Sequence, residues 1–304
     1  MQFDIQLAVA GLVVGFVVGI TGMGGGALMT PILVLLFKVQ PLAAVSSDLV
    51  ASFFMKPLGA AVHLRRGTVH RQLVLWLVVG SVPSAFAGVV LLRLLGRGHE
   101  IQQVVQNALG VALLLAAGAI VVRALLQHRG YGQAGDASDD AEVPVRRIPT
   151  ILVGVVGGLI VGMTSVGSGS LVIVSLMLMY PRLTSARLVG TDLTQAIPLV
   201  GSAALGHILY GDFHFSITAS LLVGAIPGVY LGARASAQAP SRLVKRAIAF
   251  VLVASGLKLV NMGTVPLGIL LATLAIVGEP GWMLVKRLTS PPASRALPVP
   301  EPEA

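Results

Sequence analysis

Most of the chain consists of apolar segments that are long enough to cross a membrane, separated by short charged or turn-forming stretches. These segments cover residues 5–37, 42–64, 73–92, 101–126, 149–181, 186–208, 215–235, 245–261 and 265–285. A spanning helix needs about 20 apolar residues. The segments at 5–37 and 149–181 are too long for one crossing and too short for two, and the others match one crossing each. The sequence therefore predicts an all-α polytopic membrane protein.

The composition agrees with this fold class. Charged residues make up 11% of the 304 residues, against about 25% in a soluble domain. The net charge of +9 comes from short basic clusters between apolar segments, which is where the positive-inside rule places them, so we expect a lipid bilayer as partner and no nucleic acid. Because the chain has no cysteine, disulfides and thiolate metal sites are excluded. We expect no metal and no cofactor.

The two long segments are each interrupted near the middle by glycine and hydroxyl residues, which lower helix propensity. The interruptions read Thr21-Gly22-Met23-Gly24-Gly25-Gly26 and Thr164-Ser165-Val166-Gly167-Ser168-Gly169. They align with each other at a constant spacing, and the match continues downstream. After one added loop residue, Asp48 pairs with Asp192, His63 with His207 and Pro83 with Pro227. The chain therefore divides into a first repeat (1–126), a polar cytoplasmic linker (127–148), a second repeat (149–288) and a disordered tail (289–304).

Basic residues indicate how the repeats are oriented. Arg65, Arg66 and Arg71 form the strongest cluster of the first repeat, whereas the equivalent loop at 210–214 has no Lys or Arg. The loop at 234–246 shows the opposite bias relative to residues 90–102. This exchange predicts two inverted-topology repeats, the common plan of secondary transporters. Each repeat would contain a glycine-broken re-entrant or hairpin helix followed by three transmembrane helices, with one extra helix at the C-terminus.

The two breaks are the strongest candidates for a binding site. Non-helical backbone at membrane depth is tolerated where it is buried in protein or lines a cavity. Helices that start after Gly26 and Gly169 would direct free N–H groups at an anion, and hydroxyl groups would add donors. The predicted substrate-binding residues in the breaks are Thr21, Gly22, Gly24, Gly25, Gly26, Thr164, Ser165, Gly167, Ser168 and Gly169. The alternative is that these small residues only allow close helix packing.

Lys56 is a candidate positive charge for the same site. It lies nine residues before Arg65, about 13 Å along a helix, which is too deep for its ammonium group to reach water easily. A lysine at this depth suits an anionic substrate. The alternative is a structural ion pair with Asp48 or Asp192.

Four further residues are candidates for coupling or gating. Asp48 and Asp192 each follow hydroxyl or glycine residues near the start of a span, so they could bind a coupling proton or cation, neutralise Lys56, or cap a helix. His63 and His207 lie near predicted helix ends and could titrate near neutral pH. For the two histidines, interfacial hydrogen bonding is the favoured interpretation over a proton relay.

The motifs together resemble the sulfite exporter TauE/SafE family, also called the 4-toluenesulfonate uptake permease family. The resemblance covers about residues 8–280. It rests on the segment from Gly19 to Gly26 followed by Pro31, the Ser-Ser-Asp-Leu and Gly-Thr-Asp-Leu pair, His207 with Gly211-Asp212-Phe213, and the two Gly-x-x-Pro-x-x-x-x-Gly segments at Gly80 and Gly224. It implies a bacterial inner-membrane permease for small sulfur-containing anions such as sulfite or organosulfonates, and not an enzyme.

Two other functions remain open from the sequence. An anion channel could use the same cavity passively, and an intramembrane hydrolase could use Ser168 with His207. We also leave open a homo-oligomer, the direction of transport and the coupling ion.

Overall fold

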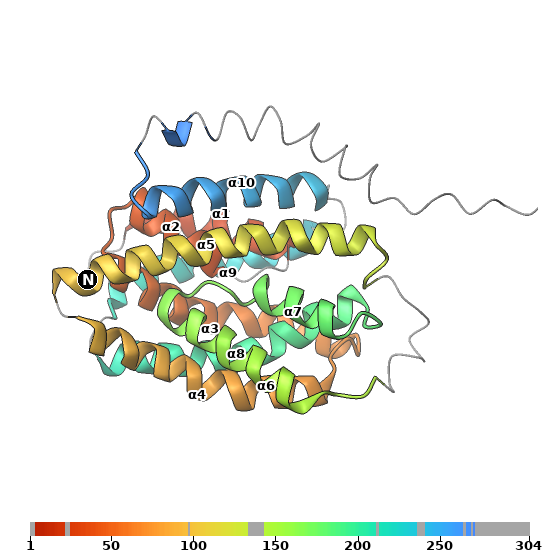
Figure 1. Cartoon of the computed structure of the whole chain (residues 1–304). Helices are drawn as coiled ribbons and strands as arrows, with labels where there is room; N and C mark the ends of the chain where they lie inside the picture. The colour runs from red at the N-terminus through yellow and green to blue at the C-terminus, as the bar shows by residue number, and fades with distance from the viewer. Residues whose placement is uncertain are drawn as a thin grey trace, which may run out of the picture.

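The computed structural model describes residues 4–21, 25–96, 98–132, 143–210, 213–235, 241–263, 266–268 and 270. The described elements are all helices, and most of them lie along one common direction (Figure 1). They are α1 (Ile5–Thr21), α2 (Gly26–Leu35), α3 (Pro41–Arg65), α4 (Arg71–Leu95), α5 (His99–His128), α6 (Arg147–Thr164), α7 (Leu171–Met179), α8 (Ser185–Leu209), α9 (Phe215–Ala235) and α10 (Ser241–Leu259). The predicted all-α polytopic fold is confirmed.

Five of the described helices are long and apolar enough to cross a membrane: α4, α5, α6, α8 and the Phe215–Gly232 part of α9. Large apolar side chains are also exposed on the outside of the bundle, for example Leu94, Ile148 and Leu209 at 78%, 72% and 66%. Soluble monomers rarely expose extensive apolar surface. The chain is therefore a multi-pass membrane protein whose outer surface faces lipid.

Each long segment forms two helices with a break between them, as predicted. Segment 5–37 gives α1 and α2, and segment 149–181 gives α6 and α7. The two arms are unequal, because α1 and α6 have 17 and 18 residues whereas α2 and α7 have 10 and 9. Three helices follow the broken segment in each repeat. The extra helix predicted over 265–285 and the tail at 289–304 lie, apart from 266–268 and 270, outside the described residues.

Two glycine-lined contacts, which we call the seams, join helices of different repeats. In the first seam, α1 packs on α9, and in the second, α6 packs on α4. A Cβ added to Gly15 of α1 would overlap the carbonyl oxygen of Ala225, and one added to Gly158 of α6 would overlap that of Ser81. Figure 1 shows α4 and α6 side by side at one edge of the bundle. Glycine is required here because the two backbones touch.

The seams repeat each other contact by contact. Gly11 of α1 faces the carbonyl of Leu221, and its equivalent Gly154 faces that of Leu77. In the first seam the first repeat provides these glycines and the second repeat the carbonyl oxygens, and in the second seam the reverse holds. Such an exchange is what a two-fold relation between the repeats produces. The inverted orientation in the membrane stays a prediction.

Candidate functional site

The two helix breaks lie in direct contact at the centre of the bundle. A Cβ added to Gly26, the first residue of α2, would overlap the carbonyl oxygen of Ser165 in the second break. A Cβ added to Gly25, the residue before α2, would be in van der Waals contact with the side chains of Met55, Ser52 and Asp48. Gly22 and Gly24, both predicted site residues, lie outside the described residues. The described parts of the two breaks therefore belong to one locality, next to α3.

The second break has an unusual backbone. Ser165 has φ 61°, Gly167 has φ 129° and Gly169 has φ 93°. Positive φ angles are strained for residues with a Cβ and easy for glycine, which explains the two glycines at 167 and 169. The turn ends α6 after Thr164 and starts α7 at Leu171.

Asp48 is held entirely inside the protein by hydroxyl groups. Thr30 of α2 and Ser165 of the second break donate to its Oδ2 at 2.7 and 2.8 Å, and Ser52 approaches Oδ1 at 3.5 Å. Asp48 is fully buried. Its carboxylate thus connects α3, the short helix after the first break and the second break.

Lys56 reaches the second break from a position about two turns further along α3 than Asp48. It is only 6% exposed, and its Nζ donates to Ser168 Oγ at 2.7 Å. The carboxylates of Asp192 and Asp48 both attract this ammonium group. A charged group buried in this way needs hydrogen bonds and opposite charge to offset the loss of water, and Lys56 receives both from the residues around the break.

Asp192 occupies the equivalent position of α8 and has different partners. Gln195 Nε2 donates to its Oδ1 at 3.0 Å, and Gln195 in turn accepts from Ser81 of α4 at 3.2 Å. The backbone N–H of Gly169 also donates to Asp192. The N–H of Gly169, one of the groups predicted to face a substrate anion, is thus oriented towards a carboxylate of the protein.

The alternative that Asp48 and Asp192 cap the helices on which they lie is wrong. Helix α3 starts at Pro41 after Gln40, and α8 starts at Ser185 after Thr184, whose side chain accepts from the Arg187 N–H. Both aspartates therefore lie at least one turn inside their helices. The Ser-Ser-Asp and Gly-Thr-Asp motifs imitate a cap because the residues that surround them are buried polar groups of the site.

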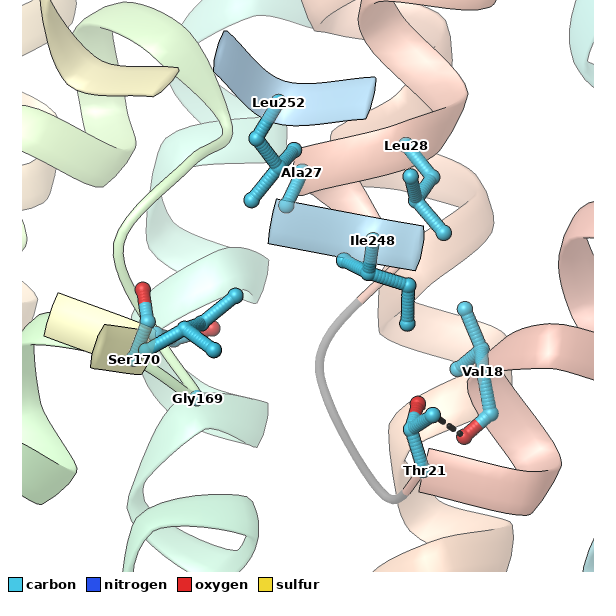
Figure 2. Close-up of a pocket in the computed structure, with 10 residues that line it drawn as sticks. Val18, Thr21, Ala27, Leu28, Gly169, Ser170, Ile248 and Leu252 are labelled. Carbon is cyan, nitrogen blue, oxygen red and sulfur yellow. Dashed lines mark hydrogen bonds between the residues drawn. The ribbon is translucent and has the colours of Figure 1, made fainter. Parts of the chain in front are cut away.

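A narrow pocket opens beside the contact between the breaks (Figure 2). Its wall includes Thr21 and Ala27 from the first broken segment and Ser168, Gly169 and Ser170 from the second. The remaining lining is apolar and comes from α1, α2, α5 and α10: Val18, Leu28, Ile120, Ile248 and Leu252. The pocket therefore combines residues of both repeats.

The two threonines that precede the breaks are oriented towards their own helices. Thr21 Oγ1 donates to the carbonyl of Val17 at 2.8 Å, and Thr164 Oγ1 donates to that of Ile160 at 2.6 Å. Such bonds satisfy the hydroxyl locally. A role for these two groups in substrate binding requires them to rotate away from the helix.

His63 and His207 form hydrogen bonds with groups outside the charged centre. His63 Nδ1 is 2.9 Å from Thr68 Oγ1 at the end of α3. His207 is fully buried near the end of α8, with Nε2 3.0 Å from the carbonyl oxygen of Gly162. The hydrogen bonds of Ser168 Oγ with Lys56 and of His207 Nε2 with Gly162 do not join the two residues of the alternative hydrolase.

Three residues of the centre were not identified by the sequence reasoning. Thr30 and Gln195 each bind one of the two aspartates. Arg123 of α5 is attracted by Asp192, and its buried Nε has no hydrogen-bond partner among the described residues. For Arg123 a signal exists, because it is a charged residue inside an otherwise apolar segment, which is a functional indication by itself.

Known proteins similar to this chain carry transporter descriptions. The family described as Sulfite exporter TauE/SafE matches residues 7–259. The Bacillus subtilis (strain 168) "Probable membrane transporter protein YjnA" is 37% identical over 258 residues, which cover 84% of this chain and 100% of that protein. "Probable membrane transporter protein YdhB" of the same organism is 25% identical over 77% of this chain and 91% of its own length. No solved structure matches significantly. The break motifs, the repeated helix pairing and this match over nearly the whole of α1–α10 lead to one conclusion: the chain belongs to the TauE/SafE family of membrane transporters.

Proposed function

We propose that the protein is a secondary transporter of the bacterial inner membrane for small sulfur-containing anions such as sulfite or organosulfonates. The observation that carries the proposal is the partly buried hydrogen bond between Lys56 and Ser168 at the contact of the two helix breaks. It combines a cation, a hydroxyl donor and irregular backbone at one point inside an apolar bundle, which is the usual composition of a transporter site.

An incoming oxyanion would replace Ser168 as the acceptor of Lys56. Ser168 Oγ would then be free to donate its own proton to another oxygen of the anion. The second break supplies the N–H group of Gly169 once Asp192 moves away from it. The substrate-binding set in this proposal consists of Lys56, Ser165, Gly167, Ser168 and Gly169, with Gly25 and Gly26 forming the opposite wall.

The charges of the centre favour coupled transport. The two negative charges of Asp48 and Asp192 already balance the positive charges of Lys56 and Arg123. An anion that enters such a site in a medium of low dielectric constant raises the electrostatic energy unless a proton or cation enters with it. Asp48 and Asp192 are therefore the coupling groups of the proposal.

The experiment is uptake and counterflow in proteoliposomes with labelled sulfite and methanesulfonate. A carrier accelerates exchange of labelled anion when unlabelled anion is inside, whereas a channel does not. Wild type should show saturable uptake with counterflow. Saturable binding without counterflow would identify a channel, and no uptake of any sulfur oxyanion would contradict the proposed substrate class.

The variant Lys56→Met tests the site itself and should abolish binding, because the cation bonded to Ser168 of the second break is lost. Lys56→Arg should retain part of the binding, since the charge remains but the planar guanidinium has a different shape. The control is Lys258→Met, which removes an exposed lysine. Normal transport by a folded Lys56→Met protein would show that Lys56 is structural.

A further inference from the structure

We propose that Arg123 of α5 is a second anion-binding residue of this protein and holds the sulfonate or sulfite group on its way between Asp192 and the face where α5 ends. The inference rests on the proposed transport of sulfur oxyanions and adds a residue that neither the break motifs nor the repeat symmetry indicate.

Arg123 is a half-buried cation whose Nε has unused hydrogen-bonding capacity. Its Nε is buried and has no partner among the described residues. The Asp192 carboxylate attracts it, and no hydrogen bond between the two side chains is formed in the described structure. Buried polar hydrogens without a partner are uncommon and require an explanation. A ligand that binds there would provide one.

The position of Arg123 follows from the helix contacts at the end of α5. Gln127, one turn further along α5, donates to Ser185 Oγ at the start of α8. Both helices therefore run inward from the same level. With about 1.5 Å per residue, Arg123 lies about 6 Å inside this level and Asp192 about 10 Å inside it. Arg123 is thus nearer to this face of the bundle than Asp192 is.

Arg123 also lies close to the pocket between the breaks. Ile120, one helical turn before it and on the same face of α5, lines the pocket together with Ser168, Gly169 and Ser170. Asp192 is attracted by both Lys56 and Arg123. The two cations therefore share one carboxylate, and an anion that displaces it gains the attraction of both Arg123 and Lys56.

The chemistry of arginine specifies the class of anion. The Nε–H and one Nη–H form a flat fork that matches two oxygens of a sulfonate, sulfite or carboxylate group. A monatomic anion such as chloride cannot use both hydrogens in the same way. The free Nε is the group that this side-on geometry needs. Arg123 therefore favours oxyanions with at least two accessible oxygens over halides.

The test is calorimetric titration of the purified full-length protein with methanesulfonate and with sulfite, followed by competition with chloride. Arg123→Gln should weaken binding of both oxyanions by about 10-fold to 100-fold, the effect of losing a charge-assisted contact. Arg123→Lys should give an intermediate affinity for oxyanions and unchanged competition by chloride. The control is Arg129→Gln, which removes an exposed arginine just after α5 and should change affinity less than two-fold.

A folded Arg123→Gln protein that binds both oxyanions within two-fold of wild type would overturn the assignment while leaving the proposed function intact. If Arg123→Gln does not fold, Arg123→Lys decides, because wild-type oxyanion affinity in that variant would exclude the fork. Failure of the wild-type protein to bind either oxyanion would overturn the proposed function and this inference together.

Discussion

The contacts of the seams follow the internal repeat, whereas those of the charged centre do not. The contact of Gly15 with Ala225 has an equivalent in the contact of Gly158 with Ser81. Of the charged residues in the centre, only the two aspartates are repeated, whereas Lys56 is matched by Val200. The difference teaches that the repeat provides a symmetric scaffold, whereas the residues that break the symmetry provide the site. Lys56 and Asp48 of the first repeat both bind the second break.

The largest effect is expected for the side of the membrane on which equivalent positions of the two repeats lie. The chain has no cysteine, so single cysteines can be introduced at the equivalent positions Arg66 and Tyr210, both of which are exposed. In inverted repeats the two positions face opposite sides of the membrane. An impermeant thiol reagent applied to intact cells should label one of them and not the other. Labelling of both from the same side would mean that the repeats are parallel.

Equal damage is expected when the two seams are disturbed at equivalent positions. Gly15→Ala and Gly158→Ala each place a methyl group on a backbone oxygen of the neighbouring helix, and overpacking of this kind costs about 1–3 kcal/mol or more. Thermal unfolding followed by tryptophan fluorescence should show similar losses of stability. Gly118→Ala is the control, because a Cβ there meets no atom within 4 Å. A large loss in only one seam variant would show that the scaffold is not symmetric.

The two aspartates should respond differently although they are equivalent in sequence. Asp192→Asn removes the negative charge that both Lys56 and Arg123 share, so anion affinity should rise by about ten-fold, or about 1.4 kcal/mol, while transport loses its coupling. Asp48→Asn should change affinity less, because hydroxyl groups surround Asp48. Titration with methanesulfonate measures both effects, with Asp4→Asn as a surface control. A larger rise in anion affinity for Asp48→Asn than for Asp192→Asn would contradict this prediction.

The smallest effect is expected for a hydroxyl that only one repeat contains. Ser168 occupies the position of Gly25 in the first repeat. Ser168→Ala should weaken anion binding by about 0.5–1.5 kcal/mol, the value of one neutral hydrogen bond. Ser202→Ala, which removes a hydroxyl bonded to Val82 of α4, is the matched control. An equal change in both variants would mean that Ser168 acts on stability and not on the anion.

The sequence was sufficient for the features that depend on apolar length and on repetition. The spans, the two breaks and the pairing of Asp48 with Asp192 follow from patterns along the chain. The partners of these residues could not be predicted, because Thr30, Gln195 and Ser81 reach the aspartates through tertiary packing, which leaves no periodic signal. Helix capping by Asp48 was an incorrect alternative for the same reason, since a short hydroxyl-rich motif looks alike at a helix start and inside a polar centre.

The seams also affect how the chain is assembled during synthesis. Helix α1 has its glycine face matched to α9, which is made after α2 through α8. At a synthesis rate of about 5–20 residues per second, α9 is made roughly ten seconds or more after α1. Helix α6 has no such delay, because α4 is already present when it emerges. Helix α1 is therefore exposed to wrong partners for longer than α6, and the second seam can form before the first.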